Sequence, residues 1–391
     1  MSSDGAQVRG RRTAAREAIL DAIRAAEPLS RVELSAMTGL TEASVSTTVR
    51  RLLDEGLVVE TGRTPTGGKP RTMLRLDPAA RIAVGVHLDD DVTTYVLTGQ
   101  TGGIISRMTR PTPAGPDPGD LVRRLVTDIG GLVDGSGIDR ARCLGIGLVW
   151  AGPRARPDAP PGPHLDRRLA EAVGWPVLLE NDATAAAVGE YWTARVEASR
   201  PFAALYMGSG IGAGIVLDGV ALRGAHGNAG EFGHVCLQVD GPPCWCGSRG
   251  CLEALAGPQV VVEAALADPA AAAEAALDPA ARRSTTAGFA AVARAARAGA
   301  PACRALLEHS ARYVAAAAES LVNLIDVDLL VLTGPGFAAA SFVYGPAISA
   351  RLASADARTW HRSVSVTVSL AAATASATGA AALVLQSSLR G

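Results

Sequence analysis

The chain has 391 residues, of which 48% are hydrophobic, and its formal net charge is −1. This length allows two or three domains, and the hydrophobic content excludes a disordered chain. Apolar runs are far shorter than the roughly 20 residues that span a bilayer, and the first twelve residues are polar and basic, unlike a signal peptide. We therefore expect a globular, cytoplasmic protein without a membrane segment.

Positive charge is concentrated in two short stretches that flank the first eighty residues. Residues 1–16 carry four arginines against a single acid, and residues 61–76 carry four basic residues against none. Nucleic-acid binding needs such local positive charge. Arginine is common throughout this chain, however, and Lys69 is its only lysine, so the pattern of secondary structure has to decide.

Two short helices are predicted first. Apolar residues recur at helical spacing over residues 19–23, and this helix must end before Pro28. Ser30 and Glu33 then form an S-x-x-E capping box that begins a second helix, and Gly39 is placed to end it.

A third helix begins at Thr41, a favourable N-cap residue. Its apolar positions, which we expect to be buried, are Val45, Val49, Leu52 and Leu53. Its outward positions are Ser44, Thr47, Thr48 and Arg51. This outward face is small, polar and basic, as expected of a helix that enters the DNA major groove.

A basic hairpin follows the third helix. Residues 57–60 and 72–76 read as strands, and residues 62–69 as the turn-rich tip between them. Three helices and such a wing predict a winged helix-turn-helix over residues 1–77 that binds double-stranded operator DNA. The residues expected to contact DNA are Ser44, Thr47, Thr48, Arg51, Arg63, Lys69 and Arg71. A three-helix protein-interaction module is the alternative.

Beyond a linker near residue 80, strands alternate with alanine-rich helices, which predicts an α/β fold with a mixed sheet. Residues 111–119 and 152–163 are rich in Pro and Gly and read as loops. Residues 264–298 are dominated by Ala, the strongest helix former, and are expected to be helical rather than disordered.

Three cysteines lie within eight positions, which indicates a metal site. Cys244, Cys246 and Cys251 with His234 would form a closed Cys₃His tetrahedron, so we expect one structural zinc; the alternative is a reduced cluster without metal. The other cysteines, expected to be ordinary buried thiols, are Cys143, Cys236 and Cys303.

Residues 180–187 read as a strand end that turns into a helix. Asp182 lies at the N-terminus of this helix, where the helix dipole should favour the ionised carboxylate. In a sugar kinase such a carboxylate accepts the proton of the attacking hydroxyl. The alternatives are that Asn181 or Asp182 caps the helix or binds a ligand.

Several of these motifs resemble one family. The segments SRVEL at 30–34, TGLT at 38–41, LDEGLV at 53–58 and GGKPR at 67–71 are similar to the N-terminal domain of repressors in the ROK family (repressor, open reading frame, kinase). GEFGH at 230–234 and C-x-C-G-x-x-G-C-x-E at 244–253 are similar to the ROK zinc signature, and 180–187 to its N-D-A-N-A-A-A pattern with Thr184 in place of Asn.

The resemblance implies an actin-like, RNase H-like sugar-kinase fold of two α/β subdomains over residues 81–391. Subdomain one would comprise about 81–190 with the C-terminal helix, and subdomain two about 191–370. It also implies zinc at the predicted Cys₃His site and assembly as a homodimer or homotetramer. The residues implied to hold the hydroxyl groups of a sugar or sugar derivative are Asn181, Asp182, Glu231, His234 and Glu253.

The chain departs from the family at the phosphate-binding loops. The first should read D-x-G-x-T, but His87 replaces its Asp, Asp89 replaces its Gly, and acidic residues continue to Asp91. Like charges about 4 Å apart repel by about 4 kcal/mol at an effective dielectric constant of 20, so we expect no ATP binding. The second, glycine-rich loop is present at 208–214, whereas the adenosine-side turn at 333–336 departs from the family pattern.

The leading hypothesis is a transcriptional repressor that senses a sugar, contains structural zinc and is not an enzyme, with Asp182 as a vestigial base. A bifunctional ATP-dependent sugar kinase is the second hypothesis. A repressor whose ligand site has decayed is the third, because the Pro-rich segment at 152–180 looks short for the family.

Overall fold

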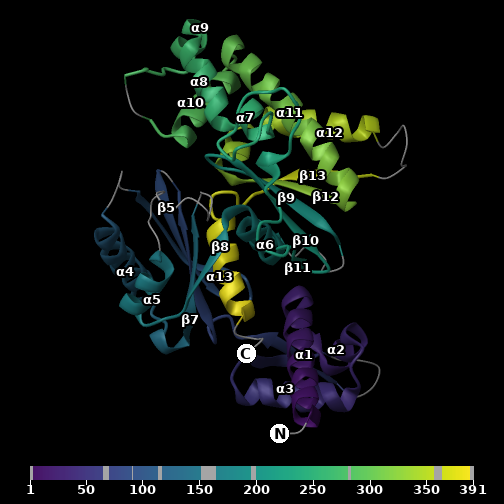
Figure 1. Cartoon of the computed structure of the whole chain (residues 1–391). Helices are drawn as coiled ribbons and strands as arrows, with labels where there is room; N and C mark the ends of the chain where they lie inside the picture. The colour runs from purple at the N-terminus through teal and green to yellow at the C-terminus, as the bar shows by residue number, and fades with distance from the viewer. Residues whose placement is uncertain are drawn as a thin grey trace.

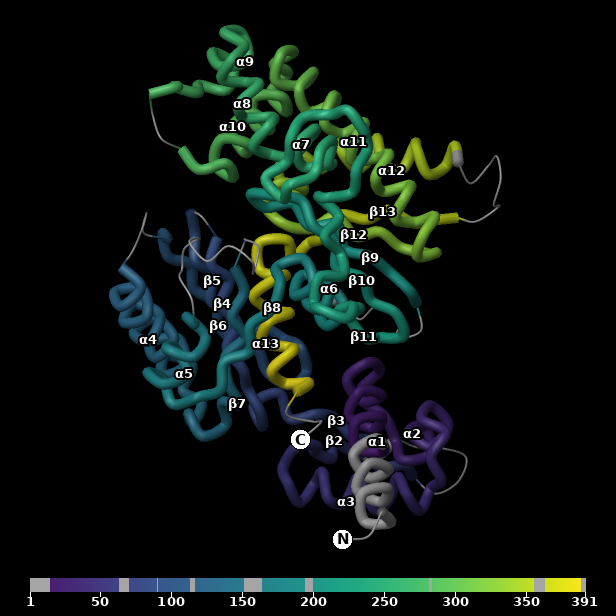
Figure 2. The backbone as a smooth tube through the Cα atoms, viewed as in Figure 1, coloured from purple at the N-terminus to yellow at the C-terminus, as the bar shows by residue number. Residues whose placement is uncertain are grey.

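The computed structural model describes residues 3–64, 70–89, 91–112, 117–150, 164–194, 200–280, 283–355 and 363–387. A small N-terminal module lies at one end of the molecule, against a larger body made of two lobes (Figure 1). The C-terminal helix runs between the lobes, as the backbone tube also shows (Figure 2). Within the described residues, none of the helices combines the length and apolar character needed to cross a membrane.

The N-terminal module has three helices and a three-stranded sheet of order β1-β3-β2. Its elements are α1 (Ser3–Ala26), β1 (Leu29–Ser30), α2 (Arg31–Thr38), α3 (Glu42–Asp54), β2 (Val58–Thr64) and β3 (Arg71–Leu76). Ser30 and Glu33 form the complete capping box of α2, and Gly39 ends that helix in the left-handed conformation at φ 69°. The Thr41 side chain caps α3 by accepting a bond from the Ser44 N–H.

The core of this module holds the apolar positions of all three helices, among them Ile19, Leu34, Val45 and Val49, which are fully buried. Leu53, expected to be buried, is only half-buried. The sequence did not indicate the two-residue strand β1, and β2 extends past the predicted start of the hairpin tip, with a bulge between Glu60 and Gly62.

The first lobe is a five-stranded sheet of order β6-β5-β4-β7-β8, in which β5 runs antiparallel to β4, and β7 and β8 run parallel to it. Its strands are β4 (Ile82–Leu88), β5 (Val92–Gly99), β6 (Ile104–Pro111), β7 (Cys143–Trp150) and β8 (Val177–Asn181). Its helices are α4 (Pro118–Gly135), the 3₁₀ turn η1 (Arg140–Arg142), α5 (Leu165–Val173) and α13 (Ala375–Ser387). Helices α4 and α5 cover one face of the sheet and α13 the other.

The second lobe repeats this topology with a sheet of order β11-β10-β9-β12-β13. Its strands are β9 (Phe202–Met207), β10 (Ile211–Leu217), β11 (Val220–Ala221), β12 (Leu329–Thr333) and β13 (Ser365–Val368). Its helices are α6 (Asp182–Ala194), η2 (Phe232–His234), α7 (Leu252–Ala256), α8 (Pro258–Ala267), α9 (Pro269–Glu274), α10 (Thr285–Arg297), α11 (Pro301–Ile325) and α12 (Gly334–Ala355). The alanine-rich segment is thus largely helical, as predicted.

Helices α6 and α13 cross between the two sheets at backbone contact distance. A Cβ atom added at Gly379 would lie 1.7 Å from the Ala185 carbonyl oxygen, and one at Gly189 would lie 2.1 Å from the Ala375 carbonyl oxygen. On the sheets, Gly85 faces the backbone of α13 and Gly214 faces that of α6 with equally little room. These glycines are required because the helices and strands pack main chain to main chain, so the centre of the molecule has little freedom to deform.

Candidate functional site

Helix α3 presents the polar face that the sequence predicted. Thr47 and Arg51 are exposed and Ser44 and Thr48 half-buried, whereas Val45, Val49 and Leu52 are fully buried. Ser46 and Arg50 are also exposed on this helix, and the sequence analysis did not single them out. Each directly follows a buried valine, and one step along a helix turns the side chain by about 100° away from the core, so their exposure could have been predicted. The exposed part of α3 therefore offers hydroxyls and two guanidinium groups, which suit base edges and phosphates.

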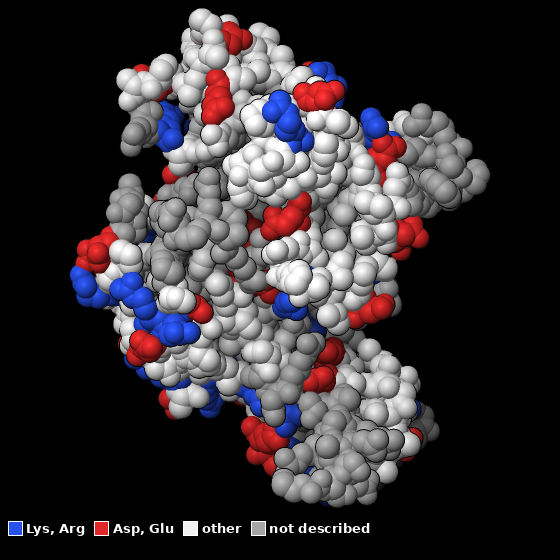
Figure 3. All heavy atoms as spheres, in the orientation of Figure 1, with Lys and Arg blue, Asp and Glu red and all other residues white. Residues whose placement is uncertain are grey.

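The wing is formed by β2 and β3. Arg71 is exposed at the start of β3, where it pairs with Thr64 of β2. The backbone of Arg63 lies in β2 opposite Thr72, but its side chain and all of Lys69 lie outside the described residues. On the face shown in Figure 3, basic and acidic side chains are interspersed over the two-lobed body.

The predicted zinc ligands come together in one cluster. The ligand atoms of His234, Cys244, Cys246 and Cys251 all lie within 4.8 Å of one another. The Cys246 and Cys251 sulfurs are 3.7 Å apart, and the Cys244 sulfur lies 3.5 Å from His234 Nδ1. A tetrahedral zinc with bonds of about 2.3 Å to sulfur and about 2.0 Å to nitrogen requires separations of about 3.5–3.8 Å. These two separations match a tetrahedral zinc, and three thiols with one imidazole are a donor set that this metal prefers.

Cys143 and Cys303 are buried, as predicted, but Cys236 is exposed, so the prediction of a buried thiol was wrong there. Cys236 lies in the loop that precedes the cysteine cluster, where its backbone pairs with Cys251 in an isolated β-bridge. Its side chain is exposed to solvent.

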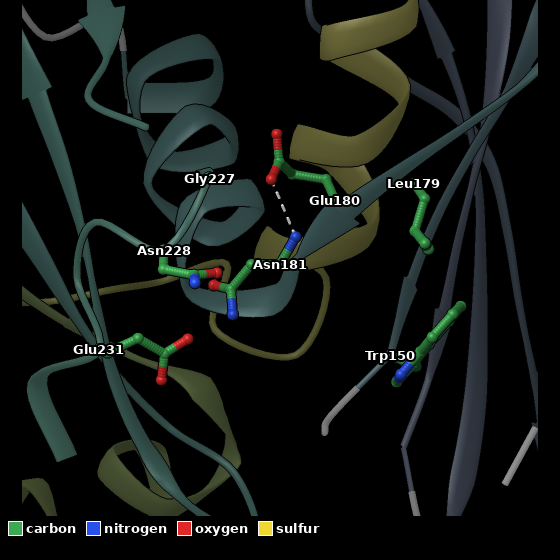
Figure 4. Close-up of a pocket in the computed structure, with 7 residues that line it drawn as sticks. All are labelled: Trp150, Leu179, Glu180, Asn181, Gly227, Asn228 and Glu231. Atoms are coloured by element: carbon green, nitrogen blue, oxygen red, sulfur yellow. Dashed lines mark hydrogen bonds between the residues drawn. The ribbon is translucent and has the colours of Figure 1, made fainter. Parts of the chain in front are cut away.

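A small polar pocket opens between the lobes where β7 and β8 end. It is lined by Trp150, Leu179, Glu180, Asn181, Gly227, Asn228 and Glu231. The side chains of Asn181 and Asn228 point toward one another, with Glu231 on the same side and Trp150 opposite (Figure 4). Amide and carboxylate groups facing an indole ring suit a small polyol, which has hydroxyl edges and apolar faces.

The pocket includes two of the five residues implied to bind a sugar, Asn181 and Glu231. Trp150, Asn228 and the buried Glu180 were not singled out for this pocket from the sequence. Glu180 accepts from the guanidinium of Arg223 at 3.0 Å and from the Asn181 N–H at 3.0 Å. This ion pair holds the end of β8, which carries Asn181. The two residues are 43 positions apart, so no local sequence pattern could predict their contact.

Asn181 caps α6. Its Oδ1 accepts from the N–H groups of Ala183 at 2.9 Å and Thr184 at 3.1 Å. Burial, followed by the negative charges of Asp89 and Glu231, raises the pKa of Asp182 to about 7. The expectation that the helix dipole would keep Asp182 ionised was therefore wrong, because desolvation and like charges outweigh the hydrogen bond from Ala183.

Trp245 connects Glu253 with His234, because its ring contacts both side chains. Glu253 accepts from the Ile211 N–H at 3.0 Å and from Trp245 Nε1 at 2.8 Å. The Trp245 ring meets the His234 ring edge to face at 4.7 Å, and His234 Nε2 lies 3.9 Å from Glu231. The cysteine loop and the carboxylates of the pocket region thus form one connected set.

The described residues of the first phosphate loop include the buried His87 and the hydrogen-bonded Asp91. His87 is buried at the end of β4, and burial lowers its pKa to about 4, so its ring is neutral near pH 7. The carboxylate of Asp91 accepts from the Ser284 hydroxyl, at the start of α10 in the other lobe. This hydrogen bond joins the two lobes.

The glycine run 208–214 forms a tight turn between β9 and β10, in which a Cβ added at Gly210 would lie 2.4 Å from Glu253 Oε2. Gly212 lies in β10 and faces Ala183 of α6. At Gly210 and Gly212, therefore, close packing is a sufficient reason for glycine. The turn at 333–336 opens α12, with Gly334 at φ 89°.

Comparison with known proteins agrees with this geometry. Residues 154–387 match the ROK family, and residues 17–69 match the MarR family. The chain is 35% identical over 187 residues to a glucokinase of Thermotoga maritima, covering 46% of this chain and 58% of that one. It is 28% identical over 252 residues to the xylose repressor of Bacillus subtilis, covering 61% and 64%. The chain thus spans less than two thirds of the length of these relatives.

Solved structures show the same fold. A ROK family transcriptional regulator described as a homolog of the E. coli MLC protein superposes with a TM-score of 0.73 at 24% identity, over 97% of both chains. A ROK glucokinase of Streptomyces griseus, solved with glucose and AMPPNP, gives 0.63 at 26% identity over 78% of this chain and 99% of that one. The predicted winged helix-turn-helix and two-lobed sugar-kinase fold are confirmed, and the chain belongs to the ROK family.

Proposed function

We propose that this protein is a transcriptional repressor that binds operator DNA through its winged helix-turn-helix and releases it when a monosaccharide or sugar derivative binds between the lobes. The observation that carries the proposal is the exposed polar and basic face of α3, joined in one chain to a two-lobed fold whose pocket is lined by Asn181, Asn228 and Glu231. The match of residues 17–69 to the MarR family and the similarity to a xylose repressor support it.

Fluorescence anisotropy tests this function. DNA selected by the protein from a random pool is titrated with wild-type protein, and D-glucose and D-xylose are then added separately. We expect sequence-specific binding that one sugar weakens. At pH 8, where an Asp182 with a pKa of about 7 is ionised, Asp182→Asn should require about ten to a hundred times more sugar for release, because it loses a charge-assisted acceptor. Coincident release curves would assign Asp182 to helix capping alone.

We infer that the chain lacks kinase activity. His87, Asp89 and Asp91 occupy the loop that should hold phosphates, His87 is neutral and Asp91 is bonded across the lobes. A bifunctional sugar kinase is the second candidate, favoured by Asp182 at the start of α6 and by the similarity to glucokinases. An assay of ADP release from ATP with D-glucose or D-xylose separates the two, and sugar-dependent turnover would refute our inference.

We further propose that His234, Cys244, Cys246 and Cys251 hold one structural zinc. A closed set of four protein ligands leaves no open position for chemistry, so the metal would cross-link the loop that precedes Glu253. Protein purified without chelator should contain one zinc per chain, and Cys246→Ser should reduce that content and lower the melting temperature. A full zinc content in Cys246→Ser, or none in the wild type, would contradict this assignment.

A further inference from the structure

We propose that helix α6 transmits the state of the pocket to the winged helix-turn-helix through a contact between Trp192 at its end and Arg24 of α1. This inference deepens the proposed function, on which it rests, by naming the residues that connect the sugar pocket to the DNA-binding module.

The two ends of α6 face different parts of the molecule. At its start, Asn181 lines the pocket and caps the helix through Ala183 and Thr184. Trp192 lies eleven positions further on, which is about 16 Å along a helix that rises 1.5 Å per residue. Helix α6 therefore spans the distance between the pocket residue Asn181 and Trp192, which contacts Arg24 of α1.

The contact at the far end joins a cation to an aromatic face. The guanidinium carbon of Arg24 lies 4.2 Å from the centre of the Trp192 ring and 5.5 Å from that of Tyr191. The Arg24 side chain is only 11% exposed, and Asp21 orients it through a 2.8 Å bond. Because both partners are largely removed from water, the cation–π attraction is stronger than at an exposed site.

Trp192 is held from behind as well. A Cβ atom at Gly102, in the turn after β5, would lie 3.0 Å from the Trp192 carbonyl oxygen and 3.3 Å from the ring. The indole is 5% exposed, and its Nε1 has no hydrogen-bond partner among the described residues. The ring therefore contributes an apolar body and a π face to this interface.

A second contact attaches the base of the wing to the same lobe. The Gln100 side chain is buried, and its Nε2 donates to the Leu57 carbonyl at 2.8 Å and to the Asp77 carbonyl at 2.6 Å. With two points of attachment, one on α1 and one beside β2 and β3, the module cannot pivot freely about the linker.

Helix α6 is built to move as a unit. Its backbone touches α13 at Gly189 and Gly379, and Gly214 of β10 touches it from the second lobe. Main-chain packing of this kind does not deform gradually. A displacement of the Asn181 end of α6 by a bound sugar would therefore be carried to its Trp192 end, and to the N-terminal module with it.

The test compares full-length wild type with Arg24→Leu and Trp192→Leu. Arg16→Leu is the matched control, because Arg16 also lies on α1 but pairs with Glu55 inside the module. Hydrogen exchange is followed at residues 15–26, and operator release is titrated with D-xylose and, separately, D-glucose. Trp192→Phe, which keeps an aromatic face beneath Arg24, should behave nearly as wild type and separates loss of the contact from misfolding.

We expect exchange at residues 15–26 to become about fivefold faster in Arg24→Leu and Trp192→Leu. The effect of sugar on operator affinity should fall from about tenfold to below about threefold in both variants and stay unchanged in Arg16→Leu. Unchanged exchange, or faster exchange with unchanged release by sugar, would overturn the proposal. If neither sugar releases the operator from the wild-type protein, the proposed function fails for these two sugars. Hydrogen exchange at residues 15–26 then decides separately whether the Arg24–Trp192 contact holds the N-terminal module.

Discussion

Asp182 lies where strand β8 passes into α6, and its surroundings oppose its charge. Burial first, and then Asp89 and Glu231, raise its pKa to about 7. This value is above the roughly 3.9 expected for Asp in the unfolded chain, so the folded protein holds a proton that the unfolded chain releases. The free energy of unfolding at this site therefore falls as the pH rises from about 4 to about 7.

We predict that Asp182→Asn removes this loss of stability. The variant should gain about 2–4 kcal/mol over wild type near pH 8 and little near pH 4.5, because Asn carries no charge and still accepts from the Ala183 N–H. Urea unfolding at both pH values measures the difference. The control is Asp134→Asn, which removes an exposed carboxylate that pairs with Arg140. Because this carboxylate is stabilised in its charged form, its loss should not raise stability at pH 8. Parallel pH profiles for wild type and Asp182→Asn would contradict the prediction.

At the scale of elements, α3 and the wing should play different parts in DNA binding. Arg51→Ala or Thr47→Ala should change which sequences are bound, because these exposed side chains lie on the helix expected to face base edges. Arg71→Ala should weaken all sequences alike and reduce the slope of log affinity against log salt by about one. Binding measured on a set of single-base variants at several salt concentrations tests this, and equal loss of specificity from both elements would contradict it.

The crossing of α6 and α13 gives a second prediction at this scale. Gly379→Ala should lower the free energy of unfolding by several kcal/mol, because its Cβ would lie 1.7 Å from the Ala185 carbonyl oxygen. Gly131→Ala is the control: Gly131 lies in α4 with no atom within 4 Å of an added Cβ, and Ala should raise stability there by about 0.5–1 kcal/mol. Denaturant unfolding of both variants measures this, and a neutral Gly379→Ala would show that the helices separate easily.

Local signals could be predicted from the sequence because their causes are local. The Ser30–Glu33 capping box, the left-handed Gly39 and the Thr41 cap depend on residues within one turn of each other, and all three are present. The pairing of β1 with β3 joins residues more than 40 positions apart, as in Leu29 with Leu74, and two residues carry too little pattern to reveal it.

The site divides in the same way. Cys244, Cys246, Cys251 and His234 could be predicted because their spacing constrains them to one loop. The ion pair of Glu180 with Arg223 and the place of Asn228 in the pocket depend on how separate strands meet. The pKa of Asp182 depends on Asp89 and Glu231, which arrive from β4 and η2, so helix position alone gave the wrong sign.

At the scale of the whole molecule, the contacts of Arg24 and Gln100 attach the DNA-binding module to the ROK domain. A net charge of −1 gives the chain as a whole no electrostatic attraction to DNA, so binding must depend on the local face of α3 and the wing. These attachments would let the proposed repressor respond to a ligand between the lobes.

The most direct test of this account is the affinity of the full-length chain for DNA selected from a random pool, measured by fluorescence anisotropy with and without a panel of monosaccharides that includes D-glucose and D-xylose. We predict sequence-specific binding that at least one sugar weakens about tenfold, a typical allosteric coupling, without any ADP formed when ATP is present. Binding that does not distinguish the selected DNA from random DNA would contradict the account.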